Sequence, residues 1–208
     1  INSYSRAEAM AQVRSILAFH TKVRGWNDIG YNFLVDRYGR VFEGRRGSID
    51  APVHGAHTGG FNTEAVGVSV LGTFQTTSPT SAALGGLVDL LSWTSARYFL
   101  NPRGSAVLTS SGGASSRYAE EEQVRMRTVS GHRDAGYTDC PGDDLYPDLP
   151  WVRSAIADRL APGLVAPQVS STAVASASNE GVARATSTAS RISAIARSGR
   201  VRRTSMAS

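Results

Sequence analysis

Long apolar runs are missing from this sequence of 208 residues. No stretch approaches the ~18 uncharged apolar residues that a membrane-spanning helix needs, so an integral membrane protein is excluded. Cysteine occurs once, at Cys140, which excludes an internal disulfide and a zinc cluster built from cysteines alone. Hydrophobic residues still make up 41% of the chain, which is enough for a packed core and excludes a wholly disordered chain.

An excess of positive charge is missing from the first 160 residues, although the whole chain has a net charge of +5. Residues 1–160 contain 16 Arg and Lys and 16 Asp and Glu, whereas residues 161–208 contain six Arg and one Glu. The basic character therefore belongs to the end of the chain. For the folded part we predict no nucleic-acid partner.

Aromatic residues are missing from residues 161–208, where 25 of the 48 positions are Ala, Ser or Thr. Such a segment buries too little apolar surface to offset the entropy cost of ordering it. We therefore predict one domain over residues 1–160 and a flexible Ala/Ser/Arg-rich tail over residues 161–208. The arginines of this tail would be attracted to an anionic surface. The chain begins at Ile1 without Met, and we interpret it as a processed or truncated piece.

Three helices are predicted from apolar spacing and from end signals. Ser5 and Glu8 form a capping box before the first helix. Ser78 and Pro79 are an N-cap and a proline at the first helical position of the second. Pro150 begins the third. The predicted ranges are residues 5–22, 79–99 and 150–160.

Short apolar runs between turn residues predict four strands, over residues 31–36, 40–43, 65–71 and 128–130. The first two flank a tight turn and form a hairpin, and the third is β-branched and apolar, as a buried central strand is. Residues 44–63 and 101–123 are predicted as loops, the second around Gly112 and Gly113. The folded part is therefore an α/β domain.

The segment 131–142 places the single cysteine eight residues after a histidine. His132 follows a predicted strand, and Cys140 lies in a Gly- and Pro-containing loop, where catalytic groups and ligands are often found. Imidazole and thiolate both suit Zn²⁺, and a catalytic zinc site takes three protein ligands, of which these residues supply two. Spacing alone leaves two alternatives open: a buried cysteine beside a hydrogen-bonded histidine, and a Cys–His nucleophilic pair.

Five motifs occur in an order that resembles the peptidoglycan recognition protein family, which is the type 2 family of zinc N-acetylmuramoyl-L-alanine amidases. They are IGYNFLVD at 29–36, VFEGR at 41–45, GAHT at 55–58, GFN at 60–62 and GHRDAGYTDCPG at 131–142. The resemblance extends over residues 2–159. It implies a central mixed β-sheet flanked by helices, with zinc in a groove at one edge.

The resemblance also implies a zinc site of two histidines and one cysteine. His132 and Cys140 match the second histidine and the cysteine. The family's first histidine ends the first strand, and residues 2–5 resemble the loop after that strand. We therefore expect the first strand and its histidine to precede Ile1, so that this chain, as an amino-terminally truncated fragment, has little amidase activity alone. We interpret His20, at a helical core spacing, as a core residue.

Four further positions match functional residues of the family. Tyr31 matches the active-site tyrosine, whose hydroxyl would donate to the oxyanion or orient the attacking water. Thr138 matches a lysine or threonine that stabilises the transition state. His57 and Asn62 match groove positions that contact the muramyl-peptide. The presence of Tyr31 and Thr138 beside both zinc ligands favours an enzyme over a binding protein.

The function that the resemblance implies is zinc-dependent hydrolysis of the amide bond between N-acetylmuramic acid and L-alanine in peptidoglycan. We expect a secreted or cell-wall-located monomer whose basic tail contacts anionic wall polymer. Two alternatives belong to other classes of protein. One is a peptidoglycan-binding module without activity, and the other is a cysteine hydrolase that uses Cys140 and His132 without metal.

Overall fold

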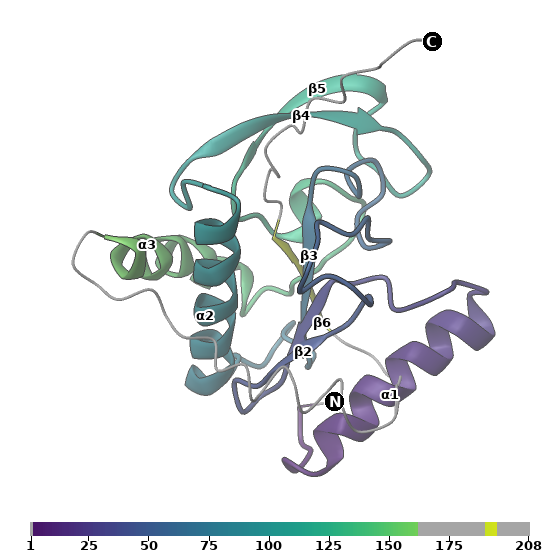
Figure 1. Cartoon of the computed structure of the whole chain (residues 1–208), viewed down its shortest axis with the longest axis vertical. Helices are drawn as coiled ribbons and strands as arrows, with labels where there is room; N and C mark the ends of the chain where they lie inside the picture. Colours follow the sequence, from purple (N-terminus) through teal and green to yellow (C-terminus); the bar gives the residue numbers. More distant parts are fainter. Residues whose placement is uncertain (1, 162–189, 195–208) are drawn as a thin grey trace.

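The structure, a computed structural model, describes residues 2–161 and 190–194. Three short turns of π or 3₁₀ helix supplement the regular elements, at Phe19–Val23, His132–Asp134 and Tyr146–Asp148. No helix in the described part is both long and apolar enough to cross a membrane. The regular elements (Figure 1) are α1 (Glu8–Ala18), β1 (Phe33–Val35), β2 (Val41–Glu43), β3 (Val66–Val70), α2 (Ser81–Arg97), β4 (Ser105–Ser111), β5 (Glu120–Arg127), α3 (Leu149–Leu160) and β6 (Ser190–Ala194).

The central sheet is mixed, with the strand order β2-β1-β3-β6. β1 pairs antiparallel with β2, Leu34 lying opposite Phe42, and parallel with β3, Leu34 lying opposite Ser69. The predicted hairpin and the predicted central strand are therefore both present. The expected class, an α/β domain with a central mixed sheet and flanking helices, is confirmed.

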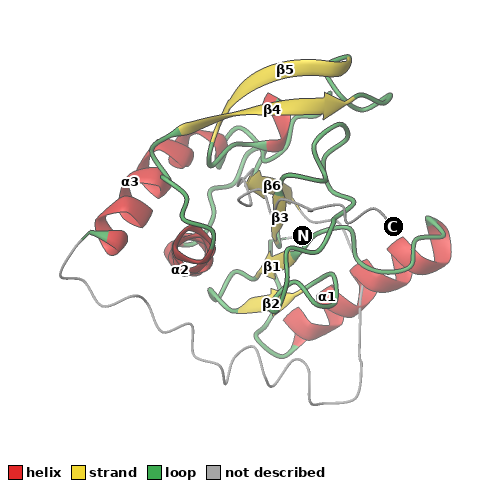
Figure 2. Cartoon of the chain, turned by 45° about the horizontal axis from the view of Figure 1, so that its top comes forward, coloured by secondary structure: helices red, strands yellow, loops and turns green. Residues whose placement is uncertain are grey.

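Helices cover both faces of this sheet, as Figure 2 shows with α1 on one side and α2 and α3 on the other. Alternation along β1 explains the arrangement, because successive side chains of a strand point to opposite faces. Phe33 and Val35 belong to the apolar cluster under α2 and α3, and Leu34 belongs to the cluster under α1. Because both faces of β1 are covered, its residues do not alternate between apolar and polar, and all three are buried.

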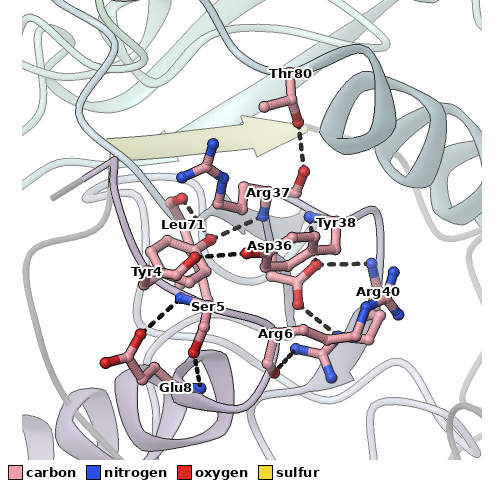
Figure 3. Close-up of polar contacts among 10 residues, drawn as sticks. All are labelled: Tyr4, Ser5, Arg6, Glu8, Asp36, Arg37, Tyr38, Arg40, Leu71 and Thr80. Atoms are coloured by element: carbon pink, nitrogen blue, oxygen red, sulfur yellow. Dashed lines mark hydrogen bonds and ion pairs between the residues drawn. The ribbon is translucent and has the colours of Figure 1, made fainter.

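The amino-terminal segment is held by side-chain hydrogen bonds to the β1–β2 turn and to the end of β3 (Figure 3). The Tyr4 hydroxyl donates to the Leu71 carbonyl at 3.0 Å and accepts from the Arg37 backbone N–H at 2.8 Å. The Tyr38 hydroxyl donates to the Tyr4 carbonyl at 2.7 Å. These bonds place α1 against the sheet.

Helix starts were predicted with mixed success. The capping box is present, since the Ser5 N–H donates to the Glu8 carboxylate at 2.7 Å and the Glu8 N–H donates to the Ser5 hydroxyl at 3.2 Å. The predicted N-cap of the second helix is wrong. Thr80 caps α2 by accepting from the Ala83 N–H, whereas the Ser78 hydroxyl donates to an aspartate elsewhere.

Residues 101–123 were predicted to form a loop. They instead contain β4 and the start of β5, which pair to form a second sheet. This hairpin lies at the end of the molecule away from α1 (Figure 1). In β5 the buried Val124 and Met126 alternate with exposed polar residues, and in β4 Leu108 is the one buried apolar residue, so each strand has only one or two apolar residues that face the core. That pattern was too sparse to recognise. No strand forms over the described residues 128–130, where one was predicted.

The predicted flexible tail lies largely outside the described residues. Within it, β6 pairs antiparallel with β3, with Val68 opposite Ile192. At these five positions the structure has a strand where a flexible chain was predicted. Unpaired backbone groups at a sheet edge bind an extended segment readily, whatever the composition of the flanking chain.

Candidate functional site

A pocket of about 300 Å³ lies where the end of α1, the start of β1, the loop before β3 and the turn at His132–Asp134 meet. It brings together four of the six predicted site residues, Tyr31, His57, Asn62 and His132, which come from four separate motifs. The lining residues are His20, Arg24, Trp26, Tyr31, Ala56, His57, Thr58, Gly59, Asn62, Ser115 and His132.

His57 forms a rigid part of the wall because two glycines make room for its ring. A Cβ added at Gly55 or at Gly67 would overlap the imidazole. The ring is buried and stacks on Tyr31, with 6.0 Å between the ring centroids. Gly55 in the loop and Gly67 in β3 are therefore steric requirements of the site.

His57 is neutral at physiological pH. Burial, and to a smaller extent the neighbouring His132 and His54, lower the pKa of His57 to about 3. Its Nδ1 lies 3.1 Å from the Thr58 hydroxyl, and its buried Nε2 has no hydrogen-bond partner among the described residues. A neutral imidazole with one nitrogen available is suited to contact a polar substrate group.

Asn62 shapes the loop that carries His57. Its Oδ1 accepts hydrogen bonds from the backbone N–H groups of His57 at 2.7 Å and Thr58 at 2.8 Å. The side chain also lines the pocket. Asn62, predicted as a substrate contact, therefore has a structural role in holding the loop.

His132 is buried in a 3₁₀ turn that its neighbours stabilise. The Asp134 carboxylate accepts from the Gly131 N–H at 2.9 Å and from the Tyr146 hydroxyl at 2.5 Å. The bond to this carboxylate raises the pKa of Tyr146. Beyond the turn, a Cβ at Gly136 would lie 3.1 Å from His132 Nε2, so a larger residue at this position would crowd the nitrogen.

Cys140 and Thr138 do not line the pocket. Their loop is tied to the histidine turn, since the Arg133 N–H donates to the Cys140 carbonyl at 2.8 Å. The Thr138 hydroxyl accepts from the Cys140 N–H at 3.2 Å. The thiol is reduced and half-buried.

Seven residues that line the pocket were not predicted to belong to the site, namely His20, Arg24, Trp26, Ala56, Thr58, Gly59 and Ser115. His20, interpreted as a core residue, is buried, and its Nδ1 accepts from the Gly30 N–H at 3.2 Å, but its ring also reaches the pocket. It lies 4.7 Å from the ring of Trp26, measured between centroids. Helical spacing identifies a buried face and does not reveal that this face ends at a pocket.

The donor chemistry fits zinc in part. His132 supplies an imidazole nitrogen and Cys140, which forms no disulfide, supplies a sulfur, and both are donors that zinc prefers. Over residues 2–161, however, no three His, Cys, Asp or Glu side chains converge as a metal-binding group.

Comparison with known proteins agrees with the fold and the motifs. A family model described as N-acetylmuramoyl-L-alanine amidase matches residues 2–143, and the chain belongs to this family. Peptidoglycan-recognition protein SC2 of Drosophila simulans is 32% identical over 145 residues, which are 70% of this chain and 64% of that protein. The human N-acetylmuramoyl-L-alanine amidase is 35% identical over 136 residues, which are 65% of this chain and 19% of that protein.

Among solved structures, the ectodomain complex of peptidoglycan recognition proteins LCa and LCx bound to tracheal cytotoxin has a similar fold. The TM-score is 0.53 and the identity 31%, over 70% of this chain and 72% of that one. The chain thus spans about two thirds or less of the curated relatives named above, 64% and 19%. The family resemblance seen in the sequence motifs is confirmed.

Proposed function

We propose that the protein hydrolyses the amide bond between N-acetylmuramic acid and L-alanine in peptidoglycan, with Zn²⁺ held by His132 and Cys140. The observation that carries the proposal is the pocket itself, in which Tyr31, His57 and His132 meet although they come from separate motifs. A catalytic zinc site takes three protein ligands. We propose that the third is a histidine, the ligand that the resemblance implies beside these two.

When bound, zinc would act as a Lewis acid that polarises the amide carbonyl and lowers the pKa of water, so that hydroxide is available as the nucleophile near neutral pH. The chain's own groups would do the rest. The Tyr31 hydroxyl would donate a hydrogen bond to the oxygen on which negative charge develops, with Thr138 as a weaker neutral donor. The neutral His57 would orient the muramyl-peptide, and Asn62 would hold the loop that positions it.

Zinc content and hydrolysis of a soluble muramyl-L-alanine peptide, both measured on the full-length protein, test this function. His132→Ala and Cys140→Ala should each lose bound zinc and measurable turnover. Tyr31→Phe should keep zinc and lower kcat about 10- to 1000-fold, as the loss of an oxyanion donor does. His54→Ala is the matched control, because His54 is exposed and does not line the pocket. Full turnover in Cys140→Ala would refute the zinc assignment.

A peptidoglycan-binding module without hydrolysis is the second candidate. It is favoured by the lack of a three-residue metal-binding group in the described part of the chain. This candidate predicts that the protein binds muramyl-peptide, holds less than one zinc per chain and releases no product when zinc is added. A metal-free cysteine hydrolase would instead be inactivated by thiol alkylation and unaffected by a chelator.

The substrate is an extracellular polymer, and we propose that the protein acts as a secreted or cell-wall-located monomer. Six arginines against one glutamate in residues 161–208 would attract anionic wall polymer. Such an attraction weakens as added salt shortens the screening length below ~10 Å.

A further inference from the structure

The segment that connects β4 and β5 reaches the pocket and joins the residues after His132. Ser115 lines the pocket, and its carbonyl accepts from the Tyr137 N–H at 3.0 Å. Ser116 forms an isolated antiparallel bridge with Gly136. The hairpin therefore contributes to the same wall as His132, and it fixes the backbone on which Tyr137 stands.

Tyr137 is an exposed aromatic residue in a fixed position. Its side chain is 67% exposed, and the guanidinium carbon of Arg117 lies 5.3 Å from its ring centroid. Arg117 is held in turn, since its Nε donates to the carbonyls of Arg133 at 2.9 Å and Gly136 at 3.0 Å. The guanidinium thus backs the tyrosine ring, much of which stays accessible to a ligand.

The positive charge of Arg117 is not neutralised by a direct ion pair in the described part of the chain. None of the described residues that line the pocket is acidic. The pair is also close to the proposed reaction centre, because the Gly136 that binds Arg117 has its Cα beside His132 Nε2.

We propose that Tyr137 and Arg117 form a subsite for a sugar ring of the glycan strand. The ring's C–H face would stack on Tyr137, and its N-acetyl carbonyl would accept a hydrogen bond from a terminal nitrogen of Arg117. An aromatic platform with a few placed donors is the usual make-up of a ligand site. The inference rests on the proposed function, in which the substrate is a muramyl-peptide.

The chemistry of that substrate selects the sugar as the occupant. Its scissile carbonyl belongs to a lactyl group, and only one carbon and one ether oxygen separate this carbonyl from the sugar ring. When the scissile carbonyl is bound near His132, the sugar ring must therefore lie close to it as well. Tyr137 lies between His132 and Cys140 in the chain, in the loop that would flank that ring.

Binding of the peptide-free disaccharide of N-acetylglucosamine and N-acetylmuramic acid tests the subsite without requiring hydrolysis. Its Kd is measured by calorimetry or NMR titration on the full chain. Tyr137→Ala should weaken binding about 3- to 10-fold, the size expected of one aromatic stacking contact. Tyr137→Trp should retain it. Trp151→Ala, which removes a 54% exposed aromatic residue from α3, is the matched control and should bind as the unmodified chain does.

Two results would overturn the proposal: equal Kd values for Tyr137→Ala and Trp151→Ala, or no binding of the disaccharide at millimolar concentration by a chain that binds the muramyl-peptide. A failure of the proposed hydrolysis can be distinguished from a failure of the proposed subsite. Disaccharide binding that depends on Tyr137, in a protein that never cleaves the amide, would support the subsite and refute the enzyme.

Discussion

His57 and Cys140 differ in how the fold positions them. His57 is buried, and its ring fits between Gly55 and Gly67, so that steric contact fixes the side chain. Cys140 is half-buried in a loop whose backbone is fixed by hydrogen bonds to Arg133 and Thr138, while its thiol is not packed in the core. One region is a rigid wall, and the other is an ordered backbone that presents a reactive side chain.

This difference agrees with the proposed roles of His57 in orienting the substrate and of Cys140 in binding zinc. A substrate-orienting group gains from rigidity, because a misplaced contact weakens catalysis. A metal ligand on a surface loop can be lost without loss of the core, because the packed clusters of the domain do not contain it. If the two regions differ in this way, changes in the surroundings of His57 should lower the stability of the protein more than changes in the Cys140 loop.

Gly67→Ala should have the largest effect. The new methyl group would overlap the buried His57 ring, and overpacking of this kind costs about 3 kcal/mol of unfolding free energy. Urea denaturation measures it. Gly85→Ala is the control: nothing lies within 4 Å of that position in α2, and the change should stabilise the protein by about 0.5–1 kcal/mol. If Gly67→Ala left the free energy of unfolding unchanged, the surroundings of the His57 ring would not be rigid.

Acidification should have the next largest effect. His57 has a folded-state pKa of about 3 against an ordinary value of 6.5, so between these values the unfolded chain binds the extra proton. Stability therefore rises with pH across this window and is lost as pH falls through it. Between pH 7 and pH 5 the loss should be about 2 kcal/mol. Urea denaturation with a chelator present measures the loss, and His57→Gln should abolish this part of the pH dependence. The same slope in that variant would contradict the burial of a neutral His57.

Thr138→Ala should have the smallest effect, about 0.5 kcal/mol, because it removes one acceptor in a half-buried loop. Asn62→Ala is the matched change in the wall. It leaves two backbone N–H groups without their acceptor and should cost about 2 kcal/mol. Thermal or urea unfolding of both variants compares the two regions directly. Equal losses of unfolding free energy in the two variants would contradict the difference between the His57 wall and the Cys140 loop.

Much of the fold follows from local pattern. The hairpin of β1 and β2, the buried strand β3 and the last helix, predicted from residue 150 and observed from Leu149, each have strong local signals. The β4–β5 hairpin was missed because β4 ends in a run of Thr and Ser, and β5 has only two apolar residues among Glu, Gln and Arg. The cap of α2 was misplaced because Ser78 and Thr80 are both good caps, and tertiary contacts decide between them.

The sequence by itself determined the family and the chemical types of the candidate ligands, because these depend on residue identity and short spacing. It also indicated that His132 and Cys140 share one loop region. Only the tertiary structure decided that Tyr31, His57 and His132 meet in one pocket, that Ser115 joins them, and that Cys140 does not line it. These relations depend on which segments pack together across long stretches of chain. Close approaches at glycines permit that packing, and no local pattern encodes it.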